Sequence, residues 1–247
     1  MRRPACLCCV VPIVGIGGMG KTTLAQVVYK EINKHFDLKL WVCVGGNFDL
    51  KDIVTKILMW ATNKEPQNLQ LDQLQKQLHS QINGKKYLLV MDDVWDYEVE
   101  KWHKLSSLLK VGKEGSKIMV TTGLMEVAEI VATIPNPHAL KGLSEEESFA
   151  LFSKIAFASG QEHKDLEAIY IGREIVKKCA NVPLAIRSLG SLLRGEDKRT
   201  WLNLKDKSLA EISENENHIM AMLKVSYHHL SSPLKNCFAY CALFPKD

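Results

Sequence analysis

The first half of the chain alternates continuous apolar runs with amphipathic stretches. Runs typical of strands buried on both faces lie at residues 10–14, 38–44, 87–91 and 116–122. Apolar residues at three- and four-residue spacing predict helices after residue 21 and over 49–61, 71–82 and 102–109. Strands that alternate with helices in this way predict right-handed βαβ units and an α/β fold with a doubly wound parallel sheet.

The pattern changes after the Pro135-Asn136-Pro137 segment. One short β-like stretch is expected at 139–143, and only helices are expected beyond it. Ser144 and Glu147 form a capping box that predicts a helix start, and Pro183 is suited to the first position of a later helix. The other helices are expected at 166–179, 201–212, 219–229 and 233–241.

A glycine-rich loop follows the first apolar run. Residues 15–23 read GIGGMGKTT, which matches G-x-x-x-x-G-K-[ST], the phosphate-binding loop. The strand before it and the helix after it, with Leu24, Val27, Val28 and Ile32 expected on one face, are the context that this motif requires. The alternative, a flexible glycine turn with an exposed lysine, explains neither flanking element.

The chemistry of this loop follows from its residue types. Glycines let successive amides point inward at phosphate oxygens, and the helix N-terminus adds its dipole. Lys21 is expected to reach the β- and γ-phosphates, and the Thr22 hydroxyl to hold Mg²⁺. The candidate nucleotide-binding residues here are Gly15, Gly17, Gly18, Met19, Gly20, Lys21, Thr22 and Thr23.

Two carboxylates end the apolar run at 87–91, about seventy residues after the loop. An acidic residue at the carboxyl end of a neighbouring parallel strand is where a P-loop ATPase holds Mg²⁺. We expect Asp92 to bind the ion through water and Asp93 to orient or deprotonate an attacking water. Thr121 and Thr122 end the next strand, and a hydroxyl there, assigned to Thr122, is expected to sense the γ-phosphate. Ordinary β-propensity explains the two threonines equally well.

Composition and charge reduce the number of function classes that remain. The 247 residues carry a formal net charge of +4 without a basic stripe interleaved with aromatics, so nucleic-acid binding is not indicated. No apolar run reaches the 18 residues that suggest a membrane-spanning helix. Seven cysteines without a framework spacing, beside a nucleotide site, favour a reducing, cytoplasmic setting.

These motifs together resemble the nucleotide-binding (NB-ARC) domain of plant disease-resistance proteins of the NBS-LRR family. The resemblance runs in order from about residue 12 to residue 247, and Trp95 points to the coiled-coil class of that family. The segments that carry it are 15–25, 36–44, 88–95, 115–122, 143–157, 181–185 and 237–245.

The resemblance implies a molecular switch that rests with ADP, exchanges it for ATP on a pathogen signal, and then assembles to trigger defence. Its cofactors are ADP or ATP with Mg²⁺, and its partners in a full receptor are the coiled-coil and leucine-rich-repeat domains, with self-association. Pro183 is expected to pack near the adenine. The implied domains are a P-loop nucleotide-binding domain at 10–137, a helical domain at 138–215, and a truncated winged-helix domain at 216–247.

Three departures from the family pattern stand out. Gly123 occupies the place of an arginine that usually follows the sensor threonines, which predicts weaker discrimination between ATP and ADP. Asn181 and Val182 replace the usual Gly-Leu before Pro183. The segments that usually precede the loop and close the winged helix are missing, so we expect a fragment or the product of a truncated gene.

Two other readings stay open at this stage. One is an enzyme, a P-loop NTPase with steady turnover or a kinase, although no lid for an acceptor is visible in the sequence. The other is an inert remnant that binds nothing, which Gly123 and the missing segments motivate. A switch can also hydrolyse ATP slowly. The rate of ATP hydrolysis and the retention of ADP therefore distinguish an NTPase with steady turnover from a switch.

Overall fold

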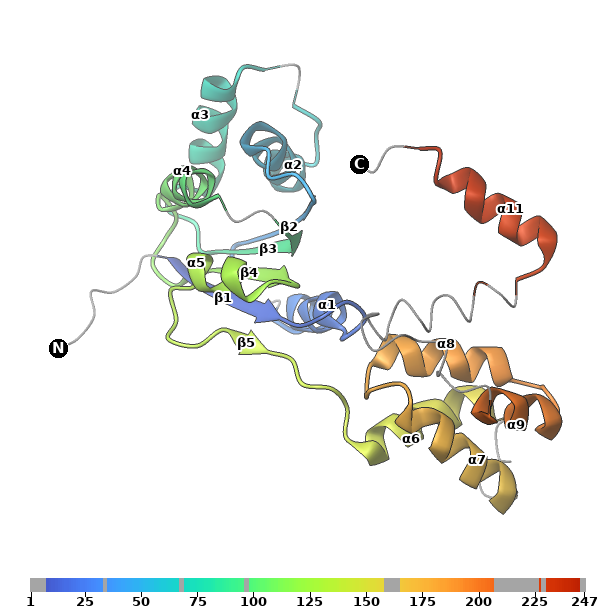
Figure 1. Ribbon diagram of the computed structural model, residues 1–247. Helices are drawn as coiled ribbons and strands as arrows, with labels where there is room; N and C mark the ends of the chain where they lie inside the picture. Colours follow the sequence, from blue (N-terminus) through green and yellow to red (C-terminus); the bar gives the residue numbers. More distant parts are fainter. Residues whose placement is uncertain are drawn as a thin grey trace. The chain divides into compact units, whose positions relative to one another are not determined.

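The computed structural model describes residues 8–32, 35–66, 69–95, 98–157, 165–206, 227 and 230–244. They fall into two compact units (Figure 1). The first holds the chain up to Ile16 and Lys21–Leu140, and the second holds Gly17–Gly20 and Lys141–Asp247. Each unit has its own apolar core, so each is described by itself.

A parallel sheet forms the centre of the first unit. Its strands are β1 (Cys8–Val14), β2 (Leu38–Gly45), β3 (Tyr87–Val94), β4 (Ser116–Thr122) and β5 (His138–Ala139). They lie in the order β2-β3-β4-β1-β5, and every pair is parallel. Because parallel strands end at the same edge, the carboxyl ends of β1, β3 and β4 meet there, which is where open α/β sheets bind their ligands. The predicted α/β fold is confirmed.

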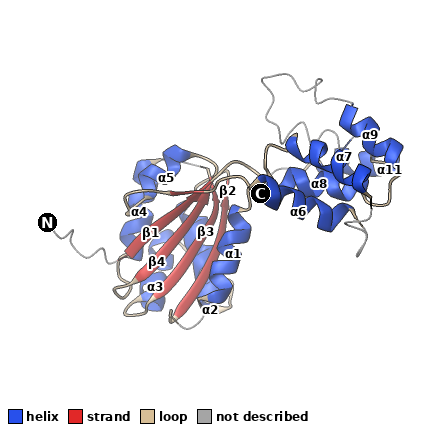
Figure 2. Ribbon diagram, turned by 90° about the horizontal axis from the view of Figure 1, so that it is seen from below, coloured by secondary structure: helices blue, strands red, loops and turns tan. Residues whose placement is uncertain are grey.

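Helices cover both faces of this sheet (Figure 2). They are α1 (Lys21–Glu31), α2 (Leu50–Thr62), α3 (Leu71–Ile82), α4 (Val99–Leu109) and α5 (Met125–Val131). The larger core joins α2, α3, α4 and α5 to one face through residues such as Leu89 and Met91. On the other face, Val90 packs with Ala25 of α1. Successive β3 residues thus serve opposite cores, as the alternation of a strand requires.

Helices make up most of the described part of the second unit beyond residue 141. They are α6 (Glu145–Ala156), α7 (Leu166–Lys177), α8 (Pro183–Leu193), α9 (Lys198–Asp206) and α11 (Ser232–Cys241). The expected capping box opens α6: the Ser144 hydroxyl accepts from Glu147 N–H at 3.2 Å, and Glu147 Oε2 accepts from Ser144 N–H at 2.8 Å. Phe152, which is fully buried, packs edge-on against Trp201 at 5.6 Å between ring centroids. No residue of α11 is buried.

The structure differs from the sequence expectations at several elements. The β-like stretch expected at 139–143 is reduced to His138–Ala139, because β1 ends at Val14 and offers no partner further on. Helix α5, only seven residues long, gave too short a periodic signal to be predicted. Val27 is 45% exposed and does not share the buried face of α1. The helix expected at 219–229 and the end of that expected at 201–212 lie outside the described residues.

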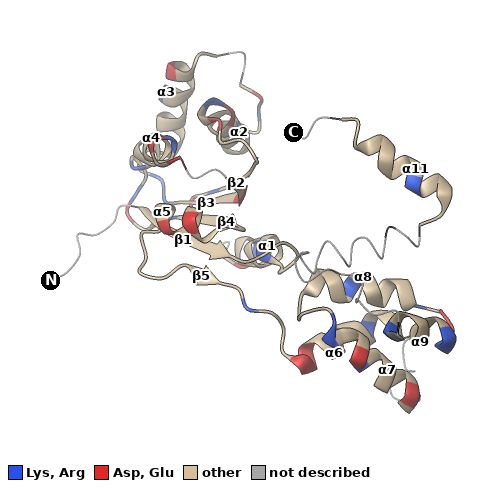
Figure 3. Ribbon diagram, in the orientation of Figure 1, with Lys and Arg blue, Asp and Glu red and all other residues tan. Residues whose placement is uncertain are grey.

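Acidic and basic residues are interspersed on the helices of each unit (Figure 3). Three glutamates in the first turn of α6, at 145–147, complement the positive end of the helix dipole. Among the described residues, no helix has both the length and the apolar character needed to cross a bilayer.

Candidate functional site

The phosphate loop runs from the end of β1 to the first residue of α1. Gly18 and Gly20 have φ values of +75° and +90°, which residues with a side chain rarely adopt. A Cβ at Gly18 would also stand 2.7 Å from the Cβ of Leu184, whose N–H donates to Gly18 O at 3.2 Å within the second unit. Glycine is therefore required at position 18 both for its backbone conformation and for the space around it.

Lys21 is the charged centre of the loop. Its side chain is 9% exposed, and Nζ donates to Gly15 O at 2.7 Å and to Ile16 O at 3.2 Å. Burial lowers the pKa of Lys21 below its ordinary value, while the carboxylates of Asp93 and Asp92 act in the opposite direction. Among the described residues, this nearly buried ammonium bonds to neutral carbonyls and to no carboxylate, so an anion placed there gains a strong electrostatic partner.

Asp92 lies at the same edge of the sheet and is 6% exposed. Its Oδ1 accepts from the Thr22 hydroxyl at 3.0 Å and from the Thr121 hydroxyl at 2.5 Å. The structure therefore brings together the two residues to which the sequence assigns Mg²⁺, from helix α1 and strand β3.

The donor chemistry at this edge fits a magnesium ion. Carboxylate and hydroxyl oxygens are the hard ligands that Mg²⁺ prefers, and the ion usually takes one or two carboxylates and completes its shell with phosphates and water. Within the described residues, no group of three or more His, Cys, Asp or Glu side chains is placed to hold a metal.

Asp93 has a left-handed backbone, with φ +62°. Its N–H donates to the Thr121 hydroxyl at 2.9 Å, and its Oδ1 accepts from the Trp95 indole N–H at 2.8 Å. The left-handed residue interrupts the alternation of β3, so that Val94 joins the same core as Met91. The carboxylates of Asp92 and Asp93 therefore have different partners. Thr121 contacts the carboxylate of Asp92 but only the backbone N–H of Asp93.

The two threonines of β4 differ in what they contact. Thr121 joins Asp92 to the backbone of Asp93, whereas the Thr122 hydroxyl accepts from Leu124 N–H at 3.0 Å. Both are fully buried. The sequence assigned the sensor role to Thr122, and that assignment stays a prediction. Thr121 and Trp95 are the contacts that sequence reasoning did not identify, because adjacent positions on a strand end look alike until the register is known.

The remaining candidates lie in the loop, on α1 and at the start of α8. Thr23 is exposed on α1, and Met19 is partly buried against the core of the second unit. Pro183 is the first residue of α8, as expected of a proline at a helix start. Its expected place near an adenine stays a prediction.

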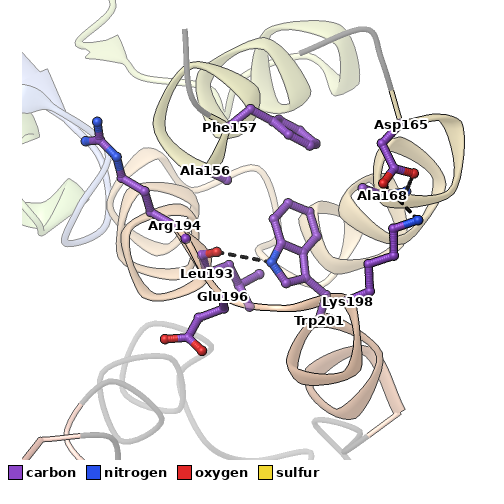
Figure 4. Close-up of a pocket in the computed structure, with 10 residues that line it drawn as sticks. Ala156, Phe157, Asp165, Ala168, Leu193, Arg194, Glu196, Lys198 and Trp201 are labelled. Carbon is purple, nitrogen blue, oxygen red and sulfur yellow. Dashed lines mark hydrogen bonds and ion pairs between the residues drawn. The ribbon is translucent and has the colours of Figure 1, made fainter. Parts of the chain in front are cut away.

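The helical unit contains a separate hollow of about 510 Å³ (Figure 4). Phe157 and Trp201 line it together with the ion pair between Asp165 and Lys198, whose Oδ2 and Nζ are 2.8 Å apart. The indole N–H of Trp201 is already satisfied by Leu193 O at 3.1 Å. None of the candidate nucleotide-binding residues lines this hollow.

Comparisons with known proteins agree with the geometry. The family model of the NB-ARC domain matches residues 3–162. The putative disease resistance protein RGA4 of Solanum bulbocastanum is 44% identical over 96% of this chain and 24% of its own length. Disease resistance protein RPP13 of Arabidopsis thaliana is 31% identical over 96% of this chain and 29% of its own length.

A solved structure shows the same fold. It is a signal transduction ATPase with numerous domains (STAND) and a tetratricopeptide repeat sensor, from Pyrococcus horikoshii. The TM-score is 0.54 at 19% identity, over 96% of this chain and 32% of that protein.

Proposed function

Because the chain belongs to the NB-ARC domain family, we propose that it is the nucleotide-binding switch of a plant immune receptor, with ADP and ATP as its ligands. The observation that carries this proposal is the network at the sheet edge. The Thr22 hydroxyl of α1 donates to Asp92 of β3, seventy residues further along the chain, and the buried ammonium of the adjacent Lys21 interacts electrostatically with the same carboxylate. No packing requirement explains a buried lysine and a buried aspartate at one strand end.

Each residue has a distinct role in this proposal. Lys21 neutralises phosphate oxygens, and the loop amides opened by Gly18 and Gly20 donate to them. Thr22 and Asp92 hold Mg²⁺, which when bound neutralises phosphate charge. Asp93 orients a water for slow cleavage of ATP, so that Asp93→Ala leaves affinity unchanged and slows cleavage. Thr122 and Pro183 are proposed to contact the γ-phosphate and the adenine.

The wider biological role also belongs to the proposal. The chain spans about a quarter of the length of the curated relatives it matches. In the full receptor we place the switch at 10–137, a helical domain at 138–215, and the start of a winged-helix domain at 216–247. Its partners there are coiled-coil and leucine-rich-repeat domains and further receptor copies, in the cytoplasm.

Turnover separates a switch from an NTPase with steady hydrolysis. A switch cleaves ATP slowly and keeps ADP bound, because each nucleotide stabilises one of two states. We would follow radiolabelled ATP in wild type and Asp93→Ala, and measure cleaved and protein-bound ADP separately. A switch gives about one retained ADP per chain, and Asp93→Ala binds ATP like wild type but cleaves it more slowly. Continuous release of ADP would favour the NTPase, and failure to bind either nucleotide would favour an inert fragment.

A further inference from the structure

Trp95 lies beside the acidic pair without belonging to either core. Its ring is 40% exposed, yet its indole N–H points at Asp93 Oδ1 and donates to it at 2.8 Å. A tryptophan half open to water gains less from burial than one in a core, such as Trp102, which is 8% exposed. The hydrogen bond to a carboxylate is the specific contact that this side chain makes.

The backbone of Asp93 explains why the carboxylate needs a partner. A non-glycine residue at φ +62° is held in a sparsely populated conformation, and such conformations persist only where surrounding contacts fix them. Two bonds do so here: Thr121 fixes the Asp93 N–H from β4, and Trp95 fixes the carboxylate. The direction of the Asp93 side chain is therefore set by Trp95.

Gly123 provides the space that the indole occupies. A Cβ at this position would stand 2.9 Å from Cη2 of Trp95, closer than real Cβ atoms approach, and 3.0 Å from Cζ3, a tight contact. The φ of Gly123 is not in the left-handed region, so space and not backbone freedom is what requires a glycine. Any side chain at position 123 must displace the Trp95 ring, and this displacement disturbs the hydrogen bond from the indole to Asp93.

We propose that Trp95 is a positioning residue for Asp93, and that Gly123 is the residue that lets Trp95 take this place. The inference rests on the proposed function, since it assigns Asp93 to the cleavage of ATP. In this view, glycine at the position of the usual family arginine is not simply a loss of charge. It belongs to an arrangement in which the ring of Trp95 lies against Gly123 and the indole N–H holds the carboxylate of Asp93.

Two substitutions break the arrangement from opposite ends. Trp95→Phe keeps a ring over Gly123 but removes the indole N–H. Gly123→Ala keeps the indole but displaces the ring. Each is expected to slow cleavage of saturating Mg²⁺-ATP by about fivefold, the worth of one hydrogen bond, with ATP affinity within about twofold of wild type. The double variant is expected to be no slower than either single one, because both act through one contact.

Two matched control variants distinguish loss of the Trp95–Asp93 contact from a general loss of stability. Trp60→Phe removes an indole from a tryptophan that is 49% exposed on α2, and Gly46→Ala adds a Cβ where nothing lies within 4 Å. Both are expected to leave cleavage unchanged. Additive losses in the double variant, or an equal loss of affinity and rate in Trp95→Phe, would overturn the proposal. So would a wild-type chain that binds Mg²⁺-ATP and never cleaves it.

A spectroscopic measurement tests the contact without nucleotide. The five tryptophans give five indole N–H signals in a ¹⁵N-labelled chain, and the one missing in Trp95→Phe belongs to Trp95. Asp93→Ala and Gly123→Ala are expected to move that signal alone, and Gly46→Ala to leave it in place. An unmoved signal in Asp93→Ala would contradict the contact itself. If no nucleotide binds, the proposed function and the role in cleavage fail together, while this signal still reports whether Trp95 holds Asp93.

Discussion

The buried polar side chains of the two units differ in kind. In the described part of the first unit, four of the five buried polar residues, Lys21, Asp92, Thr121 and Thr122, lie around the carboxyl edge of the sheet, and the fifth, Ser116, begins β4. In that of the second, Ser148 is the buried polar residue, and its hydroxyl bonds to Asn181 Oδ1 at 3.3 Å. In the core of this unit, Phe152 and Trp201 are buried and Phe157 packs against them, with the three rings in mutual contact.

This difference teaches where function and stability reside. Burying a lysine and an aspartate costs stability unless each has partners. The stability of the fold alone therefore does not explain the buried charges at the edge of the first unit. In the described part of the helical unit, no lysine or aspartate is buried. We therefore expect substitutions at the edge to change nucleotide binding and substitutions in the helical core to change stability.

The largest effect is expected at the phosphate loop. Lys21→Ala should reduce affinity for ADP by more than about a hundredfold, because a desolvated charge-assisted contact to phosphate is lost. Lys30→Ala, at an exposed lysine of the same helix, is the control and should bind ADP like wild type. Calorimetric titration with ADP and Mg²⁺ measures both. Equal affinity in wild type and Lys21→Ala would remove the basis for the site.

A substitution in the helical core should lower stability and leave ADP binding unchanged. Phe152→Ala removes a fully buried ring and should lower the free energy of unfolding of the second unit by about 3–5 kcal/mol. Urea denaturation followed by tryptophan fluorescence measures this. Leu166→Ala, at a leucine that is 80% exposed, should change it little. If Phe152→Ala weakened ADP binding in the folded protein as strongly as Lys21→Ala, the separation between the units would not hold.

An intermediate effect is expected where polar contacts and packing meet, at Thr121. Thr121→Val preserves the shape but leaves Asp93 N–H and Asp92 Oδ1 without this partner, which should cost about 1–3 kcal/mol of stability. The same variant should weaken Mg²⁺-dependent ADP binding, because Asp92 loses one of its supports. Thr55→Val, whose hydroxyl bonds only to Lys51 O in α2, is the control. A fully stable Thr121→Val with normal binding would show that the network is not needed.

The smallest effect concerns pH in the helical unit. Burial raises the pKa of the Cys179 thiol to about 12 from an ordinary 9.0. A raised pKa means that the folded chain retains a proton that the unfolded chain gives up. The stability from this group is complete below 9.0 and is lost as pH rises toward about 12.

Cys179→Ala should therefore lose less stability than wild type between about pH 8 and pH 10. Cys237→Ala, at an exposed cysteine of α11, should follow wild type. Urea midpoints at the two pH values give the comparison. Parallel losses in wild type and Cys179→Ala would refute the assignment of the alkaline effect to this thiol.

Sequence reasoning predicted the sheet, the loop and the acidic strand end because each depends on local pattern. The apolar run at 87–91, bounded by charges, needs no partner to be read as a buried strand. The contacts among Thr22, Asp92 and Thr121 depend on strand register, which links residues far apart in the chain, so sequence placed the first two together by motif alone. Trp95 could be read as part of a motif, but its bond to Asp93 depends on the left-handed backbone there.

The role of Gly123 could not be predicted from the sequence either. The sequence shows a missing arginine and predicts weaker discrimination between ATP and ADP, which stays a prediction. Only the structure shows that the Trp95 ring lies where a side chain at position 123 would begin.

The central claim, that this chain holds a nucleotide at the edge of its sheet, is tested most directly by what the purified protein carries. The chain is denatured, the released nucleotide is identified by chromatography, and Lys21→Ala is treated in the same way. The account predicts close to one ADP per wild-type chain and none from the variant, with thermal stabilisation by added ADP and Mg²⁺ in wild type only. No bound nucleotide and no stabilisation in wild type would contradict it.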